Sequence, residues 1–354
     1  ETVYMLQVPT DKPEILATGF QILRDWADSV AFEAEEVEKE RGVVLEEWRH
    51  GRGASRRLFD KQAPIVFHGS KYPDRLPIGK PEIIKGAPRD ALVRFYKDWY
   101  RPDLMAVIAV GDFEVADIEA RIKSEFASMQ APKKPRPRTF QKVPAHDKPL
   151  VTIEADPEMT QTSVSITSKM PHRPEKSARD YRRSLAERLF TAMLNARLDE
   201  VRRQPNAPFL TAVSGVSKLV RTADAFRVSA TVKDDAVQQG FEALLEEVVR
   251  VQRHGFTATE LDRAKSQLLR QFQQTVKERD KQDARVYAQE IVRNFLEEES
   301  MAGAEAELAM VERFLPTYTV AEMNELAKKL TAGSRVIGVA GPPTMAKPTA
   351  DAML

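Results

Sequence analysis

Cysteine is absent from the 354 residues of this sequence. The chain therefore contains no disulfide and no metal site built on thiolates. This absence does not decide the compartment, because proteins of oxidising compartments can also lack cysteine. Long apolar runs are absent as well, and no stretch approaches the length that a membrane-spanning helix needs. We therefore expect no membrane span within these residues.

No charge of one sign predominates either. Lys and Arg number 54 and Asp and Glu number 53, so the chain lacks the strong field that attracts nucleic acid or an anionic membrane. We expect neither class of partner. The composition, with 42% hydrophobic and 30% charged residues, is typical of a globular protein. The length is that of two domains of ordinary size.

The pattern along the chain predicts an α+β fold of two similar domains, each an antiparallel-rich mixed sheet packed against several helices. In the first domain, residues 1–130, strand-like segments at 1–9 and 103–111 accompany helical periodicity. Residues 131–149 are rich in proline and basic residues, which favours an extended linker over a polybasic contact. The second domain, residues 150–354, also ends in a helix followed by a strand that finishes in glycine.

Individual elements follow from the period of the apolar residues. In the first domain helices are predicted at 13–30, 32–50, 88–100 and 115–129. In the second domain strands are predicted at 150–155, 162–170, 209–219, 225–233 and 334–343, with a long helix through 182–203.

The segment EKERGVVLEEWRH, Glu38–His50, combines helical periodicity with clustered carboxylates. Residues seven apart return to nearly the same direction after two turns, so Glu40 and Glu47 share one stripe. Glu46 points about a third of a turn away. Surface helices more often offset such stacked carboxylates with Lys or Arg four residues on. Periodicity alone leaves two interpretations open, a solvated acidic face and part of a site.

A di-iron site is a further interpretation, because Glu47 and His50 have the Glu-x-x-His spacing of di-iron four-helix bundles. Such a site needs a second Glu-x-x-His, and no other histidine here has Glu three residues before it. We therefore interpret His50 as a helix-end residue near the carboxylates. The other histidines are interpreted as structural, with His68 in a loop and His254 at a helix C-terminus.

Three separated segments then carry a resemblance to a known family. They are ERGVVLEEWR, FYKDWYRPDLMAVIAVGDF and RVQRHGFTATELDRAKSQLL, in this order along the chain. They resemble the pitrilysin and insulin-degrading enzyme family of zinc peptidases, and the similarity covers essentially the whole chain. It is greatest to bacterial, often periplasmic, members in which a single chain holds two such halves. This chain resembles an N-terminal half.

The resemblance implies a zinc site whose third protein ligand is Glu47, with Glu40 as a helper that orients groups around the metal. The family's two histidine ligands lie in a His-x-x-Glu-His motif. None of the five histidines of this chain stands in that arrangement or its reverse. We therefore expect the motif upstream of Glu1, in a natural protein that extends beyond this residue.

The implied activity is that of a zinc-dependent metalloendopeptidase that hydrolyses peptides or unfolded polypeptides in an enclosed chamber. A second homologous half, in the same chain or separate, and a periplasmic or secreted location are implied with it. This chain alone is expected to be inactive, because it holds one of three zinc ligands. The alternative is a non-catalytic scaffold or partner subunit of the same family.

Overall fold

The structure is a computed structural model that describes residues 2–354. It divides into two compact units, each built from three stretches of the chain. Unit 1 comprises Glu1–Arg49, Ile78–Thr139 and Gln282–Glu297, and unit 2 comprises His50–Pro77, Phe140–Lys281 and Glu298–Leu354. The sequence predicted two domains that are each continuous in the chain, whereas each unit is assembled from three separate stretches. The predicted domain limits and the linker at 131–149 stay a prediction.

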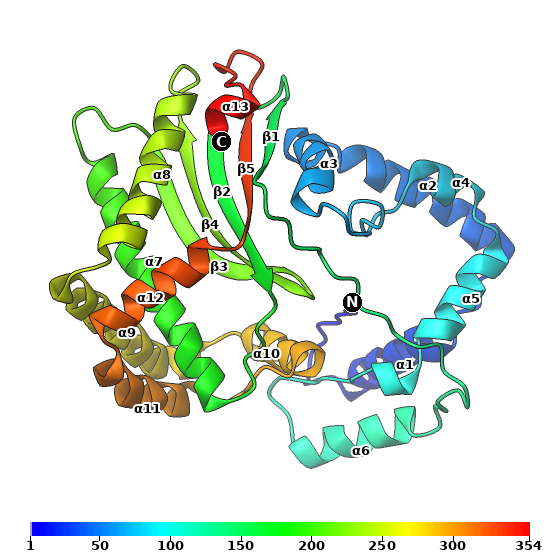
Figure 1. Cartoon of the computed structure of the whole chain (residues 1–354). Coiled ribbons are helices and arrows are strands. Elements are labelled where there is room, and N and C mark those ends of the chain that lie inside the picture. Colours follow the sequence, from blue (N-terminus) through cyan, green and yellow to red (C-terminus); the bar gives the residue numbers. More distant parts are fainter. Residues whose placement is uncertain (1) are drawn as a thin grey trace. The chain divides into compact units, whose positions relative to one another are not determined.

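Unit 2 is built on one five-stranded mixed sheet in the order β1-β5-β2-β4-β3 (Figure 1). Its strands are β1 (Leu150–Ala155), β2 (Thr162–Pro171), β3 (Thr211–Val220), β4 (Ala223–Val232) and β5 (Ser334–Gly341). Strand β1 pairs with β5 in parallel, and the other neighbours are antiparallel. The strands expected in the second domain and the α+β class are confirmed.

The helices of unit 2 account for most of its remaining residues. They are α3 (Ala54–Val66), α7 (Ala178–Arg202), α8 (Val237–His254), α9 (Ala258–Glu278), α11 (Ala304–Phe314), α12 (Val320–Thr331) and α13 (Ala350–Met353), with 3₁₀ turns η2 (Arg279–Lys281) and η3 (Leu315–Thr317). Several begin at a residue that caps the first turn, as the sequence allows. Thr257 and Glu260 form a reciprocal capping box at α9, and Ser177 caps α7.

The core of unit 2 lies between one face of the sheet and helices α7, α8 and α12, which gather on the same side in Figure 1. Alternate residues of the strands point into it, among them Ile166 and Phe226. Phe190 of α7 is fully buried and meets the ring of Phe226 edge-on at 5.5 Å. The other face of the sheet carries many Ser and Thr side chains, together with Val336 of β5 and Val213 of β3.

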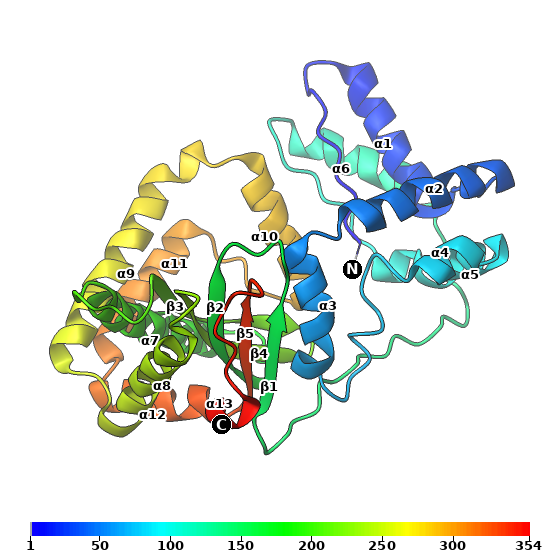
Figure 2. The same cartoon turned by 90° about the horizontal axis from the view of Figure 1, so that it is seen from above.

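Helix α3 contacts β1 and β5 and lies beside them in Figure 2. Its Arg57 donates two hydrogen bonds to Asp156, of 2.6 and 2.7 Å, at the end of β1. At the other end of α3, the buried Lys169 of β2 donates to the carbonyl oxygen of Val66 at 2.8 Å. A cation is favourable there because the last carbonyls of a helix carry partial negative charge. The sequence had not placed residues 54–66 with the second sheet.

Unit 1 is helical in the part of the chain that the structure describes. Its elements are α1 (Pro13–Asp28), α2 (Ala34–His50, of which His50 falls in unit 2), α4 (Pro81–Gly86), α5 (Arg89–Trp99), η1 (Pro102–Leu104), α6 (Val115–Phe126) and α10 (Ala284–Glu297). Within residues 2–354, neither 2–9 nor 105–110 forms a strand ladder. The expected sheet of the first domain is therefore not found among these residues. Apolar, alternating segments become strands only where a partner completes their backbone hydrogen bonds.

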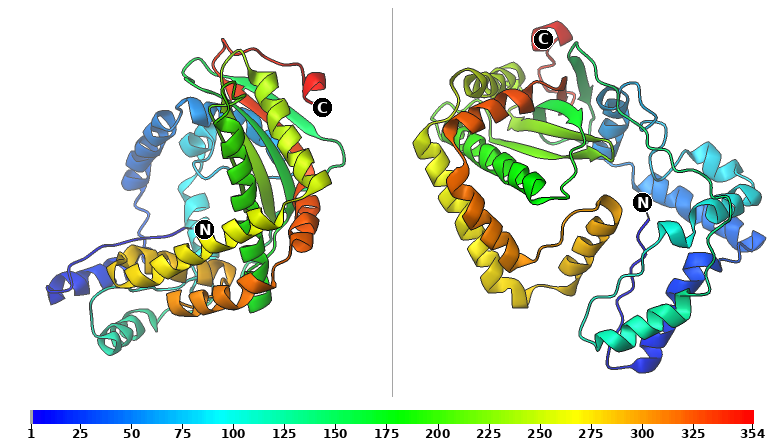
Figure 3. Two further views of the ribbon diagram at one scale, coloured as in Figure 1. Left: turned by 90° about the vertical axis from the view of Figure 1, so that its left-hand side faces the viewer. Right: turned by 60° about the horizontal axis from the view of Figure 1, so that its bottom comes forward.

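The proline- and arginine-rich segment is irregular, as predicted, but it is attached along its length. Arg136 pairs with Asp98 at 2.9 Å and lies over the ring of Trp99 in unit 1. In unit 2, Thr222 donates to the carbonyl oxygen of Gln141 at 2.7 Å, and the backbone N–H of His146 donates to a serine hydroxyl of β5 at 2.8 Å. Figure 3 follows this extended segment from two further sides.

Candidate metal-ligand helix

Helix α2 turns its acidic residues to solvent and most of its apolar residues to protein, although Val43 is exposed. Glu40 and Glu47 are exposed, whereas Val37, Val44 and Trp48 are half-buried. Because the helix is regular from Ala34 to His50, residues seven apart point in nearly the same direction. The structure thus places Glu40 and Glu47 on one exposed stripe.

Ion pairing separates these two residues from the other acids of α2. The remaining acidic side chains each meet a basic residue three or four positions away: Glu35 and Glu36 with Lys39, Glu38 with Arg41, and Glu46 with Arg49. Within the described residues, neither Glu40 nor Glu47 makes a side-chain hydrogen bond or an ion pair. Their carboxylates are available to an external cation, while Glu46 is already neutralised.

The two free carboxylates cannot share one ion. Seven residues of helix rise by about 10 Å, which exceeds the span of a single coordination shell. Glu47 and Glu40 therefore fit different roles, one as a ligand and the other as a residue that acts on surrounding groups. These roles stay a prediction.

Arg41 holds α2 from a direction about 100° around the helix from Glu40. Its guanidinium donates to the carbonyl oxygen of Ile84 at 2.5 Å and to that of Ala87, at the end of α4. One carbonyl of the last turn of α4 is thereby satisfied, and the favourable charge at a helix C-terminus adds to the contact. Arg41 thus holds α2 in one rotational setting, and the direction of Glu47 is set with it.

The histidines lie apart from one another. His50 is exposed at the last position of α2, His68 follows α3 in a turn, and His254 ends α8 before Gly255. Across residues 2–354, no group of three His, Asp or Glu side chains is close enough to hold a metal ion. The same residues contain no helix long and apolar enough to cross a bilayer.

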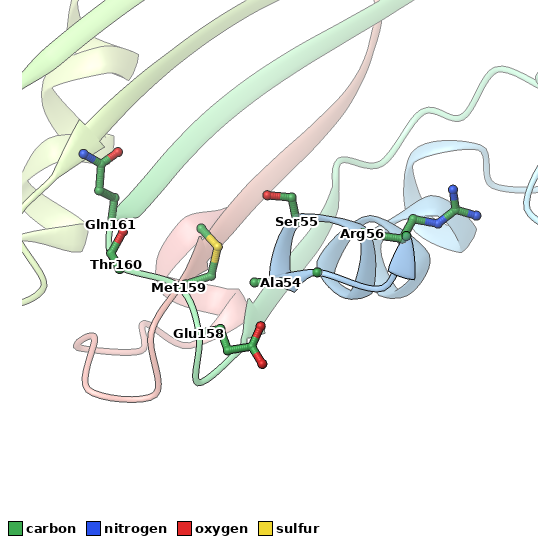
Figure 4. A pocket seen from close by; sticks show the side chains of 9 residues that line it. Ala54, Ser55, Arg56, Glu158, Met159, Thr160 and Gln161 are labelled. Carbon is green, nitrogen blue, oxygen red and sulfur yellow. The ribbon is translucent and has the colours of Figure 1, made fainter. Parts of the chain in front are cut away.

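A pocket of about 490 Å³ lies elsewhere, in unit 2, between the start of α3 and the loop that joins β1 to β2. Figure 4 shows Glu158, Met159 and Thr160 of this loop facing Ala54 and Ser55. The ion pair of Arg57 with Asp156 closes the loop onto α3 beside it. The pocket is not lined by Glu40 or Glu47.

Sequence reasoning missed the anchoring of α3, because Arg57 and Asp156 are 99 residues apart. It also missed the polar face of the second sheet. The alternation of Ser163, Ser165 and Thr167 with apolar residues in β2 was the available signal.

Comparisons with known proteins place this architecture in a family. Residues 87–268, just over half of the chain, match the family described as Peptidase M16 inactive domain. The chain therefore belongs to the peptidase M16 family, and the resemblance to pitrilysin and insulin-degrading enzyme is confirmed. Glu40 and Glu47 lie outside the matched residues.

Among individual proteins, the chain is similar to the zinc protease PQQL-like of Arabidopsis thaliana, with 31% identity over 93% of this chain. It is 27% identical over 93% of its length to the probable zinc protease PqqL of Escherichia coli. It spans 32% and 35% of these two relatives, about a third of each. The crystal structure of the first half of the periplasmic protease PqqL from Escherichia coli superimposes with a TM-score of 0.88 at 23% identity, covering 94% of this chain and 72% of that one. The fold and a role within a peptidase family follow.

Proposed function

We propose that this chain is the part of a zinc-dependent metalloendopeptidase that supplies the distal zinc ligand, Glu47. The observation that carries the proposal is the pairing pattern of α2, in which only Glu40 and Glu47, of its acidic residues, have no partner within residues 2–354. A carboxylate without a basic partner remains available to a metal cation. The names of the relatives, zinc proteases, agree with this cation being zinc.

The proposed chemistry divides between the ion and the protein. Zinc supplies Lewis acidity, which acidifies water and polarises the scissile carbonyl of a peptide. Glu47 provides one anionic oxygen ligand. Glu40, two turns away on the same stripe, orients the groups that surround the ion. Arg41 keeps both carboxylates directed to the same side by holding α2 against α4.

The remaining ligands come, in this proposal, from a further polypeptide segment with two histidines in a His-x-x-Glu-His motif. Unit 1 has apolar surface for such a segment: Met5 is 79% exposed, Ile83 60% and Phe95 59%. Residues 2–9 and 105–110 also have no ladder partner among the described residues and could accept further strands. A second homologous half would complete the enclosed chamber.

The proposed substrate is a peptide or an unfolded polypeptide, and the proposed location is the periplasm or the exterior. The location is supported by the periplasmic relative from Escherichia coli. A non-catalytic partner subunit is the competing proposal, and one observation favours it: the matched family description is that of an inactive domain.

The test compares neighbouring glutamates in the complete protein. Glu47→Gln should lose most of the bound zinc and reduce turnover of a quenched peptide by at least about a hundredfold, because an amide is a poor zinc ligand. Glu46→Gln is the matched control and should leave both zinc content and turnover within about twofold of the unmodified protein. Metal analysis and peptide hydrolysis are measured on the same preparations. Equal losses from both substitutions would show that the ligand is misassigned.

A further inference from the structure

The face of the sheet in unit 2 that points away from α7 and α8 is polar. Thr167 of β2, Arg227 of β4 and Gly215 of β3 are directly opposite one another across the three strands. Directly paired residues lie on the same face of a sheet. Ile166 and Phe226, their neighbours along the strands, point to the opposite face and are buried in the core. The row of Thr167, Arg227 and Gly215 is therefore on the face away from that core.

The residues around this row are mostly small and hydroxylated. Those that share its face on β2, β4 and β3 include Ser163, Ser165, Ser229, Thr231, Thr211 and Ser217, together with the exposed Val213 and with Ala225. Helix α3 lies over the β1 and β5 end of the sheet, and its last turn also reaches β2, where Lys169 donates to the carbonyl oxygen of Val66. Arg227 and Ser217 are exposed, and Ser229 and Thr231 are half-buried. We call this open part of the sheet the β2-β4-β3 face.

Arg227 is the charged centre of the β2-β4-β3 face. Within residues 2–354 its guanidinium has no hydrogen bond, ion pair or aromatic partner, whereas Lys169 on the same face is bonded to a carbonyl oxygen at 2.8 Å. The residue is exposed as a whole, yet the protein around it displaces water and lowers the pKa of the guanidinium. A partly dehydrated cation without a counterion binds an anion more strongly than a fully hydrated one.

Open space lies next to this cation. A Cβ atom built on Gly215 would meet no atom within 4 Å, although Gly215 stands directly opposite Arg227 in the ladder. On the other side Arg227 is flanked by Thr167, whose side chain is short. The space beside Gly215, opposite Arg227, is therefore open to an incoming side chain.

We propose that the β2-β4-β3 face receives an extended polypeptide and that Arg227 binds a carboxylate side chain of it, with Gly215 leaving room for that side chain. The proposal rests on the proposed function, since it names acidic residues as a preferred feature of the peptide substrate. A guanidinium matches a carboxylate with two parallel hydrogen bonds, which gives geometric as well as charge selectivity. The hydroxyls along β2 and β4 serve both donors and acceptors of a peptide backbone.

Charge complementarity selects this occupant. A nucleic acid strand needs several cations along its phosphates and gains from stacked aromatic rings. The strands of this face contribute one guanidinium without a partner among the described residues and no aromatic side chain. A single carboxylate on an otherwise neutral segment matches that charge.

The test measures binding without catalysis. Two fluorescent ten-residue Gly/Ser peptides, identical except for a central Glu or Gln, are titrated against the 354-residue chain in low salt with EDTA present. The Glu peptide should bind about tenfold more tightly than the Gln peptide, as expected for a hydrogen bond between charged groups, and the difference should shrink as salt rises. Equal affinities, or a preference that salt does not weaken, would overturn the proposal.

Variants assign the preference to Arg227. Arg227→Gln should bring the ratio of the two affinities to about one. Gly215→Glu should also bring this ratio to about one although Arg227 is kept, because the introduced carboxylate would pair with the guanidinium. Gly215→Gln, which adds no charge, should leave the preference for the Glu peptide unchanged. Lys329→Gln, an exposed lysine of α12, is the charge-matched control and should also retain it. A preference that survives in both Arg227→Gln and Gly215→Glu would place the anion site elsewhere.

These outcomes are separable from those of the zinc proposal. The peptide titration is done in EDTA, which removes zinc. Whether the Glu peptide binds more tightly than the Gln peptide is therefore independent of whether Glu47 is a zinc ligand. Conversely, a protein that hydrolyses no peptide can still discriminate the two peptides through Arg227. Far-UV circular dichroism of each variant shows whether its fold is preserved.

Discussion

At the scale of single residues, the informative side chains are charged groups that have no partner within the described residues. The fold neutralises Glu46 with Arg49 and Asp156 with Arg57, and it leaves Glu40, Glu47 and Arg227 without such a contact. A paired charge contributes mainly to the structure around it, while an unpaired charge remains available to a ligand. This contrast underlies both the zinc site proposed on α2 and the peptide site proposed at Arg227.

The pair of Arg57 and Asp156 should give stability a specific pH dependence. The hydrogen bond from Arg57 lowers the pKa of Asp156 from 3.8 to about 2. A lowered pKa in the folded state means that the unfolded state binds the proton more readily, so this stabilisation is present above pH 4 and is lost as the pH falls toward 2. The urea midpoint of the chain should therefore decrease across that window.

Asp156→Asn should flatten this part of the pH profile and lower the midpoint at neutral pH. Asp235→Asn, at an exposed aspartate of the same unit, is the control and should leave the profile unchanged. A profile that is identical in the unmodified chain and in Asp156→Asn would mean that the pair contributes no pH-dependent stability.

At the scale of elements, α2 and α3 show how neighbours in sequence acquire separate roles. They are adjacent, with Gly51, Arg52 and Gly53 between them. Helix α3 is tied to the second sheet by Arg57, while most of α2 belongs to unit 1 and is held by Arg41.

Two glycines within helices should respond in opposite ways to alanine. A Cβ at Gly240 of α8 would lie 2.3 Å from a methyl carbon of Val232, so Gly240→Ala should destabilise the chain by about 1–3 kcal/mol. A Cβ at Gly42 of α2 would meet no atom within 4 Å, and Gly42→Ala should stabilise by about 0.5–1 kcal/mol through helix propensity.

Urea unfolding of the two variants and of the unmodified chain provides the free energies of unfolding. The two substitutions are predicted to change the free energy of unfolding in opposite directions, and by the amounts given. A neutral Gly240→Ala together with a destabilising Gly42→Ala would contradict the packing described for α8 and for α2.

At the scale of the whole molecule, the chain covers about a third of its curated relatives, and the zinc site proposed for it requires ligands from another segment. A catalytic zinc ion normally takes three protein ligands and leaves one position for water. The 354-residue chain alone should therefore bind zinc weakly, with most of the metal removed by gel filtration, and should hydrolyse no quenched peptide. Robust activity of this chain alone would show that the ligand set is wrong.

The extended segment at 131–149 should be the first site of proteolysis in the native chain. Lys133 and Lys134 are exposed in irregular structure, and such segments are cut before helices or strands. Brief trypsin treatment should cleave first after Lys133 or Arg138, since the prolines after Lys134 and Arg136 block cleavage at those two residues. Mass spectrometry of the early fragments identifies the bonds. Early cuts inside α2 with an intact 131–149 segment would contradict the predicted linker.

The sequence by itself determined the α+β class, the five strands of unit 2 and the shared stripe of Glu40 and Glu47. These features depend on the period of apolar and charged residues over a few turns or a single strand, which is local information. The positions of His68 in a turn and His254 at a helix end follow from the same kind of signal.

Only the tertiary structure decided which segments pair and which charged residues far apart in sequence meet. Residues 105–110 have the composition of a buried strand, yet a ladder depends on a partner that local periodicity cannot identify. Arg57 reaches Asp156 across 99 positions of sequence, and Lys169 of β2 reaches the last turn of α3 across 103. Arg227 likewise becomes a candidate site because the fold brings Gly215, rather than a carboxylate, opposite it. Such contacts are set by the path of the whole chain, and for that reason the sequence pattern did not reveal them.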